Sequence, residues 1–248
     1  MKMKHILNFS SSLCFLLMFT LAQAQVKPDA TSDVEQIADS IPVKKDRYGL
    51  RVGVDLFKLT RGFYDKNYKG IELTGDFRWN KKYYLAAELG NENKTTEDDR
   101  LTTNSKGSYL KAGFDYNMYE NWLDMENIIS IGLRYGFSTF SQELYSYKIY
   151  NPNPYWGELA AIPANQEFNG LSASWIEVVT GMKAKMFNNV FVGFSVQLKT
   201  LVTNKKPDGF DNLYIPGFNR TYNGSFGIGF NYSVTYFVPL YKKKVVVK

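Results

Sequence analysis

The C-terminal stretch from Phe226 to Tyr236 alternates without interruption between two kinds of side chain. Apolar or aromatic residues occupy the even positions, and Gly, Asn, Ser or Thr occupies the odd positions. Because successive side chains of a β-strand point to opposite faces, this pattern predicts a strand with one apolar and one small, polar face. Two folds accept such a strand. In a soluble sandwich the apolar face meets a protein core, and in a membrane-spanning barrel it meets lipid.

Seven further stretches alternate in the same way. Each is about as long as a tilted strand needs to cross a bilayer, which takes roughly 9–11 residues. Strands of soluble domains are usually shorter, at about 5–6 residues. We expect strands within residues 48–57, 70–79, 83–90, 108–118, 128–137, 172–185, 189–199 and 223–240.

The connections between these strands alternate between short and long. Short or moderate turns lie at 80–82, 119–127 and 186–189, and the long connections cover 59–69, 91–107, 139–170 and 200–223. Outer-membrane barrels have short periplasmic turns and long outer loops, whereas a sandwich has no reason to keep that order. The pattern predicts an all-β fold, an eight-stranded antiparallel transmembrane β-barrel over residues 48–240.

Aromatic residues support a membrane setting. Aromatic rings favour the membrane–water interface, and many lie at the predicted periplasmic ends of the strands, namely Tyr48, Trp79, Tyr83, Tyr116, Tyr119, Trp122, Phe187, Tyr236 and Tyr241.

The N-terminus has the pattern of a cleavable signal peptide over residues 1–24. A basic start is followed by an apolar run and then by Ala22-Gln23-Ala24, which fits signal peptidase. Residues 25–47 are expected to form a periplasmic segment with a short amphipathic helix, and residues 241–248 a basic periplasmic tail. The apolar face of that helix is a predicted partner-binding surface, formed by Val34, Ile37 and Ile41.

Cleavage would remove the only His and the only Cys, His5 and Cys14. The exported chain then has no imidazole or thiol for catalysis and no His/Cys metal site. We therefore expect no enzyme, no catalytic residue, no metal and no cofactor. The net charge of +6 falls to about +4 when Lys2 and Lys4 leave, and this mild, evenly spread charge does not indicate nucleic-acid binding.

Charged side chains at the inward positions nearly balance in sign. The interior of an eight-stranded barrel is just wide enough for side chains, so these charges must pair there. The predicted ion-pair network of the lumen consists of Arg51, Asp55, Glu72, Asp76, Arg78, Glu88, Lys111, Asp115, Arg134, Glu177, Lys183 and Lys199. The alternative is a narrow solute channel, although a selective pore usually carries one dominant sign of charge.

Two long outer loops are rich in aromatic and apolar residues. Exposed aromatics often mark protein interfaces, so the predicted partner-binding residues of these loops are Pro152, Pro154, Tyr155, Trp156, Phe210, Tyr214, Ile215 and Phe218. The alternative is that the two loops pack on each other as a lid.

With its "VTYFVPLYKKK" ending, from Val234 to Lys244, the chain resembles small eight-stranded outer-membrane barrels, closest to uncharacterised barrels of the Bacteroidota. Such barrels serve as adhesins, tethers, small channels, lipid enzymes or accessory subunits of larger machines. The resemblance implies a protein of the bacterial outer membrane whose partners are outer-membrane lipid and other outer-membrane or surface proteins. We expect a non-enzymatic accessory subunit of an outer-membrane complex, with protein assembly or secretion as the particular hypothesis. A small-solute channel and a surface adhesin are the alternatives.

Overall fold

The structure is a computed structural model that describes residues 43–119, 126–152, 155, 157, 159–220 and 224–246. The predicted signal peptide and the predicted helix with Val34, Ile37 and Ile41 lie outside the described residues, as do Pro154 and Trp156. Val43–Lys248 form one compact unit.

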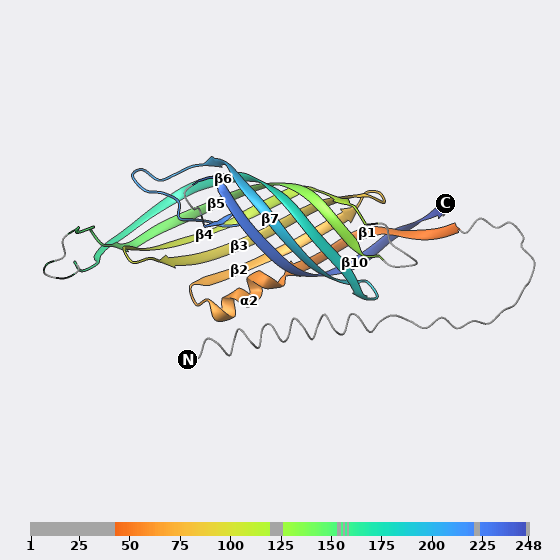
Figure 1. Cartoon of the computed structure of the whole chain (residues 1–248), viewed down its shortest axis with the longest axis horizontal. Helices are drawn as coiled ribbons and strands as arrows, with labels where there is room; N and C mark the ends of the chain where they lie inside the picture. Colours follow the sequence, from red (N-terminus) through yellow and green to blue (C-terminus); the bar gives the residue numbers. More distant parts are fainter. Residues whose placement is uncertain are drawn as a thin grey trace, which may run out of the picture. The chain divides into compact units, whose positions relative to one another are not determined.

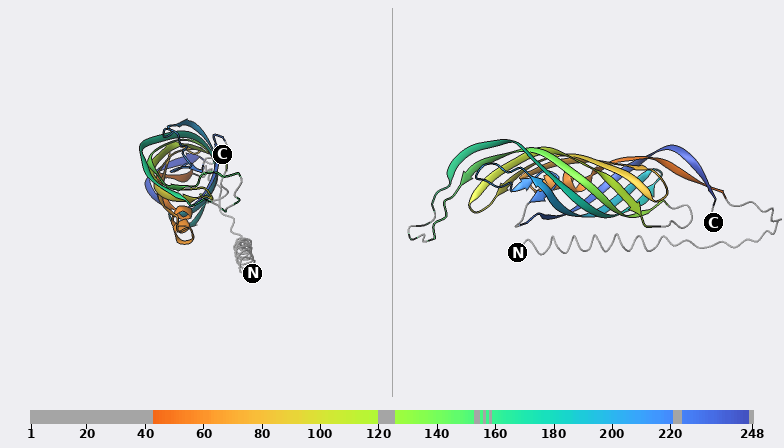
Figure 2. Two further views of the ribbon diagram at one scale, coloured as in Figure 1. Left: turned by 90° about the vertical axis from the view of Figure 1, so that its left-hand side faces the viewer. Right: turned by 90° about the horizontal axis from the view of Figure 1, so that it is seen from above.

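Within the described ranges, eight long strands close an antiparallel barrel in the order β1-β10-β7-β6-β5-β4-β3-β2 (Figure 1). The view along the barrel in Figure 2 shows the strands as a ring. The predicted fold class is therefore confirmed. The strands are β1 (Val43–Asp55), β2 (Tyr68–Arg78), β3 (Tyr83–Glu97), β4 (Leu101–Asn117), β5 (Ile128–Tyr147), β6 (Ile162–Phe187), β7 (Val190–Asn204) and β10 (Phe226–Val246). The two remaining strands, β8 (Tyr214–Ile215) and β9 (Asn219–Arg220), pair only with each other.

The outward side chains of the barrel form an apolar band. Strand β5 shows the pattern most clearly: its inward Ser130 and Arg134 are buried, while alternating apolar residues between them are exposed. A continuous band of this size is not expected to face water. Its members on β2, β5, β7 and β10 include Ile71, Leu73, Ile129, Ile131, Leu133, Tyr135, Phe137, Val192, Phe194, Val196, Leu198, Ile228 and Phe230. No helix in the described ranges is long and apolar enough to span a membrane.

Several strands continue beyond the predicted ends on the side of the long loops. Strands β3, β5 and β6 keep pairing through much of 91–107 and 139–170, which the sequence predicted as loops. The outward residues next to the band are polar, such as Asn91 and Thr139, and exposed aromatics return further along β5 at Tyr145 and Tyr147. The alternation of apolar and polar residues therefore ends at the edge of the band, although the backbone ladder does not.

At the end with the short turns, the barrel is also longer than the sequence predicted. Residues 241–246, expected to form a tail, pair with residues 43–48 as the lower part of the β10–β1 ladder. The rings of Tyr48 and Tyr241 stack with their centroids 5.3 Å apart. The predicted limits of 48 and 240 are corrected to Val43 and Val246, because each flank supplies the backbone partner of the other.

A helix, α2 (Leu56–Tyr64), replaces the predicted end of the first strand. Asp55 terminates β1 and caps the helix, since its side chain accepts a hydrogen bond of 2.7 Å from the backbone N–H of Phe57. Leu56 and Phe57 therefore belong to a helix and not to the barrel ladder.

Candidate functional site

We call the end of the barrel with the short turns its lower end and the end with the long connections its upper end. The lower part of the lumen is filled by two compact ion-pair groups. Asp76 on β2 contacts both Arg51 and Lys183, the latter at 2.5 Å. Asp115 on β4 accepts two hydrogen bonds from Arg134, at 2.7 and 2.8 Å. Each acid is thus matched by a base from another strand, as burial of charge requires.

The centre of the lumen is organised around Lys111 on β4, which is 1% exposed. Its Nζ lies 2.8 Å from Glu88, 3.2 Å from Glu72 and 3.9 Å from Glu177. Glu177 also lies 3.4 Å from Lys199 and accepts a 2.6 Å hydrogen bond from the indole of Trp175. Lys111 therefore connects strands from opposite parts of the ring.

The structure brings most of the predicted lumen residues together but places two of them elsewhere. Asp55 is fully buried but serves as the cap of α2. Arg78 donates to the carbonyl of Arg47 and lies 3.3 Å from Asp46, at the end of the barrel near the short turns. The other predicted residues form ion pairs with one another, namely Arg51, Glu72, Asp76, Glu88, Lys111, Asp115, Arg134, Glu177, Lys183 and Lys199.

An upper polar group contains residues that the sequence prediction missed. Lys58 of α2 lies 2.7 Å from Glu72 and 2.8 Å from Glu92. Glu92 is completely buried and also accepts hydrogen bonds from the hydroxyls of Tyr68 and Tyr214, at 3.1 and 2.8 Å. Glu92 could have been found, because it continues the inward parity of Glu88 past the predicted end of its strand.

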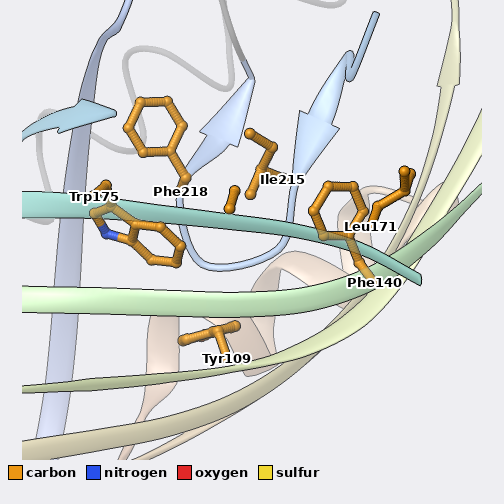
Figure 3. Packing of buried hydrophobic residues seen from close by; sticks show 7 residues of the cluster. Tyr109, Phe140, Leu171, Trp175, Ile215 and Phe218 are labelled. Carbon is orange, nitrogen blue, oxygen red and sulfur yellow. The ribbon is translucent and has the colours of Figure 1, made fainter. Parts of the chain in front are cut away.

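The β8–β9 hairpin lies inside the mouth of the barrel. Figure 3 shows Ile215 and Phe218 of the hairpin facing side chains of the barrel wall. The ring of Phe218 meets that of Trp175 edge-on at 5.9 Å, and Lys199 donates to the Gly217 carbonyl at 2.7 Å. The buried cluster consists of Tyr109, Phe140, Leu171, Ala173, Trp175, Ile215 and Phe218.

This hairpin corrects part of the predicted partner surface. Tyr214 is 4% exposed, and Ile215 and Phe218 are completely buried. In this structure they cannot contact a partner, because they fill the mouth. Phe210 is half-buried and stacks on Phe168 at 5.9 Å. The loop therefore packs into the barrel, while Phe210 rests against the long β6 strand.

A cavity of about 50 Å³ lies in the lower lumen, lined by residues that include Glu88, Asp115, Arg134, Lys183 and Ser195. A cavity volume of this kind needs about 10–15 Å³ to hold one water molecule. The cavity therefore has room for a few waters among these polar groups. Among the described residues, no cluster of His, Cys, Asp or Glu could hold a metal ion.

The upper part of β5 and β6, residues 141–170, forms a projecting hairpin, and its β5 arm also pairs with β4 as far as Tyr147. The β6 residues that precede Ala173 pair only with β5, because the ladder between β6 and β7 ends at the pair Ala173 and Asn204. Pro152 and Tyr155 at its tip are exposed, Tyr155 by 81%. Further exposed apolar and aromatic residues of this hairpin are Tyr145, Tyr147, Ile149, Tyr150, Leu159 and Ile162.

The opposite end of the barrel is tied together by Glu126, in the turn between β4 and β5. Its carboxylate accepts hydrogen bonds from Arg47 on β1 and lies 3.0 Å from Lys185 on β6. Burial alone would raise the pKa of Glu126, but the hydrogen bonds and charges of Arg47 and Lys185 lower this pKa below its usual value. Glu126 thereby links β1 and β6 at this end of the barrel.

The fold and its interior define a class: a closed β-barrel with an apolar outer band, a charged but filled lumen and a closed mouth. The chain belongs to the family described as domain of unknown function (DUF6048), whose model matches residues 6–243. No curated protein matches. Among solved structures, the chain is similar to Ail, the attachment invasion locus protein of Yersinia pestis, with a TM-score of 0.40 and 11% identity over 77% of this chain and 97% of that chain.

Proposed function

We propose that this protein is a non-enzymatic, structural barrel of the bacterial outer membrane, exported by the signal peptide at residues 1–24. The apolar band supports the membrane location, since water would be a poor solvent for so many outward Leu, Ile, Val and Phe side chains. A membrane of the outer-membrane type is the usual setting for closed antiparallel barrels with this outward face.

The filled lumen is the observation that carries the proposal. Opposite charges pair across the interior, and the β8–β9 hairpin closes the mouth. A channel needs a continuous wet path lined by groups that select a solute. The filled lumen instead favours a rigid membrane anchor that functions through its outer surfaces.

The projecting hairpin is the proposed partner-binding surface. Exposed Tyr and Ile side chains at its tip are the residue types that dominate protein interfaces. Its position on a rigid barrel holds these side chains in place. We propose that it binds another outer-membrane protein, which makes the barrel an accessory subunit of a complex. Complexes that assemble or secrete outer-membrane proteins are the first candidates, since small barrels of the class that the sequence resembles serve there.

Site-specific photocrosslinking in native membranes tests this proposal. A photoreactive amino acid at Tyr155 should capture one protein in good yield, and the same protein should co-purify stoichiometrically in mild detergent. The matched control places the photoreactive residue at Leu198, which is similarly accessible but lies in the apolar band. Replacement of residues 148–161 by a short turn should abolish co-purification. A lone monomer, with no product specific to position 155, would contradict the accessory role. A crosslink only to a protein of another cell would indicate an adhesin.

A further inference from the structure

The wall of the barrel is incomplete next to β1. Strand β1 pairs with β10 only over Ser233–Val246 and with β2 only over Leu73–Phe77. Residues 226–232 of β10 and 68–72 of β2 therefore have no β1 residue beside them. An edge strand left in this way exposes backbone donors and acceptors, which are unfavourable in lipid.

Helix α2 occupies this gap. It is in contact with both β2 and β10, and the ring of Phe57 packs on Phe230 at 4.5 Å. Figure 1 shows α2 continuing from β1 along the side of β2. Nine residues of helix rise about 14 Å. The five steps from Tyr68 to Leu73 span about 17 Å of strand, or about 13 Å along the axis of a barrel with a tilt near 40°. The length of the helix thus matches the unpaired part of β2.

The orientation of α2 is opposite to that of an ordinary surface helix. Surface helices turn their apolar stripe toward the protein and their charged residues toward water. In α2 the outward side chains are apolar or aromatic: Phe63 is 88% exposed, Tyr64 68% and Leu56 37%. Its basic residues turn toward the barrel. Lys58 reaches Glu72 and Glu92, and the guanidinium of Arg61 lies 4.1 Å from the centre of the Tyr68 ring.

The hydroxyl on this outward face is also satisfied within the helix. Thr60 donates to the backbone carbonyl of Leu56 at 2.8 Å, one turn earlier. Such a bond to the carbonyl one turn earlier is common for Thr in helices, and it allows the hydroxyl to face lipid without an unpaired donor. The outward face of α2 is therefore continuous in character with the neighbouring band residues Ile71 and Ile228.

We propose that α2 is a lipid-binding surface, which forms the outer half of the barrel wall in place of β1 and contacts the acyl chains of the membrane. Lys58 is its latch: it crosses the gap, pairs with the lumen acids Glu72 and Glu92, and separates this polar interior from lipid. The inference rests on the proposed membrane location and is independent of any protein partner.

Collision measurements on spin labels test the lipid contact. In a Cys14→Ser background, Phe63→Cys is labelled and the full chain is placed in phosphatidylcholine vesicles. The label should collide often with oxygen, which concentrates in lipid. It should collide only rarely with a nickel chelate that stays in water. Leu198→Cys in the band is the lipid control, and Lys66→Cys, exposed in the turn after α2, is the water control.

Each outcome decides the proposal. A Phe63 label that matches the Leu198 label supports lipid contact. A match with the Lys66 label overturns it, and so does protection from both reagents, which would show that protein covers the helix. A Leu198 label that behaves like the Lys66 label refutes the membrane location itself, and with it the inference.

The latch is tested by the mobility of the Phe63 label. Lys58→Met should narrow the lines of the electron paramagnetic resonance spectrum, which means a more mobile label, because the helix loses its bonds to Glu72 and Glu92. Lys58→Arg should restore the wild-type spectrum, and Lys206→Met, in an exposed ion pair with Asp211, should leave it unchanged. An unchanged spectrum in Lys58→Met would show that the lysine does not hold α2.

Discussion

Single residues in the lumen show how a barrel can hold charge in its interior. Lys111 is buried between the carboxylates of Glu72, Glu88 and Glu177, so its ammonium offsets three acids at once. Removal of one partner from a buried ionic group is costly, because the remaining charges lose their compensation and cannot reach water.

Lys111→Met should therefore lower the free energy of unfolding by about 3–5 kcal/mol. Lys206→Met is the matched control, since its ion pair with Asp211 is more than half exposed. Such surface pairs contribute less than about 1 kcal/mol. Urea unfolding in detergent micelles, followed by circular dichroism, measures both. Equal losses in the two variants would show that the lumen network is not a source of stability.

The alternation of the strands was sufficient to place Lys111, Glu72 and Glu177 inside the barrel. It was not sufficient for Glu92, because the predicted strand ended at residue 90, where outward apolar residues cease. Lys58 could not be found by strand parity at all, since it enters the lumen from a helix.

Among the elements, the turn between β4 and β5 is held by charges that titrate. The folded-state pKa of Glu126 is lower than its unfolded value, so the carboxylate is stabilised in its ionised form. Its contribution to stability is present above the unfolded pKa, near 4.3, and is lost as the pH falls through the folded pKa.

Glu126→Gln should consequently destabilise the barrel at pH 7, and its difference from wild type should begin to shrink below about pH 4.3 and disappear only as the pH falls through the lowered folded-state pKa. Urea unfolding of wild type and variant in micelles, measured from pH 3 to pH 7, checks this. Glu167→Gln, at an exposed glutamate of the projecting hairpin, is the control and should leave the stability at pH 7 unchanged. A difference between wild type and Glu126→Gln that stays constant with pH would mean that the charge of Glu126 is not what ties the turn to β1 and β6.

The β8–β9 hairpin and α2 show why some elements were not predictable. Phe218 and Ile215 have the composition of an exposed interface, and only the distant residues Trp175 and Phe140 give them a buried site. Nothing local in the sequence distinguishes these outcomes. Asp55 ends β1 by capping α2, but an aspartate is equally compatible with an inward strand position, so Leu56 and Phe57 were read as the end of a strand and most of the helix fell in the predicted connection at 59–69.

For the molecule as a whole, the barrel architecture could be predicted from the sequence, but the length of its strands could not. The order of short and long connections predicted an eight-stranded closed barrel, since it depends on the path of the chain and not on single contacts. The upper walls of β3 to β6 and the lower ladder between β1 and β10 were missed, because backbone pairing continues there past the end of the regular apolar–polar alternation.

The lumen of the barrel is obstructed at three levels in series, the lowest being the ion pairs of Asp76 with Arg51 and Lys183 and of Asp115 with Arg134. The β8–β9 hairpin closes the mouth, and the ion pairs around Lys111 fill the interior below it.

In planar lipid bilayers the wild type should pass no steady current. A variant in which a short Gly-Ser linker replaces residues 207–220 should also be silent, because the second obstruction remains. Adding Lys111→Ala and Glu177→Ala to that variant should not open it either, because the ion pairs of Asp76 and Asp115 still fill the lower lumen. Replacement of residues 148–161, outside the lumen, is the control and should not open the barrel. Steady current from the wild type would identify a channel, and current from the linker variant alone would show that the ion pairs do not block the passage of ions.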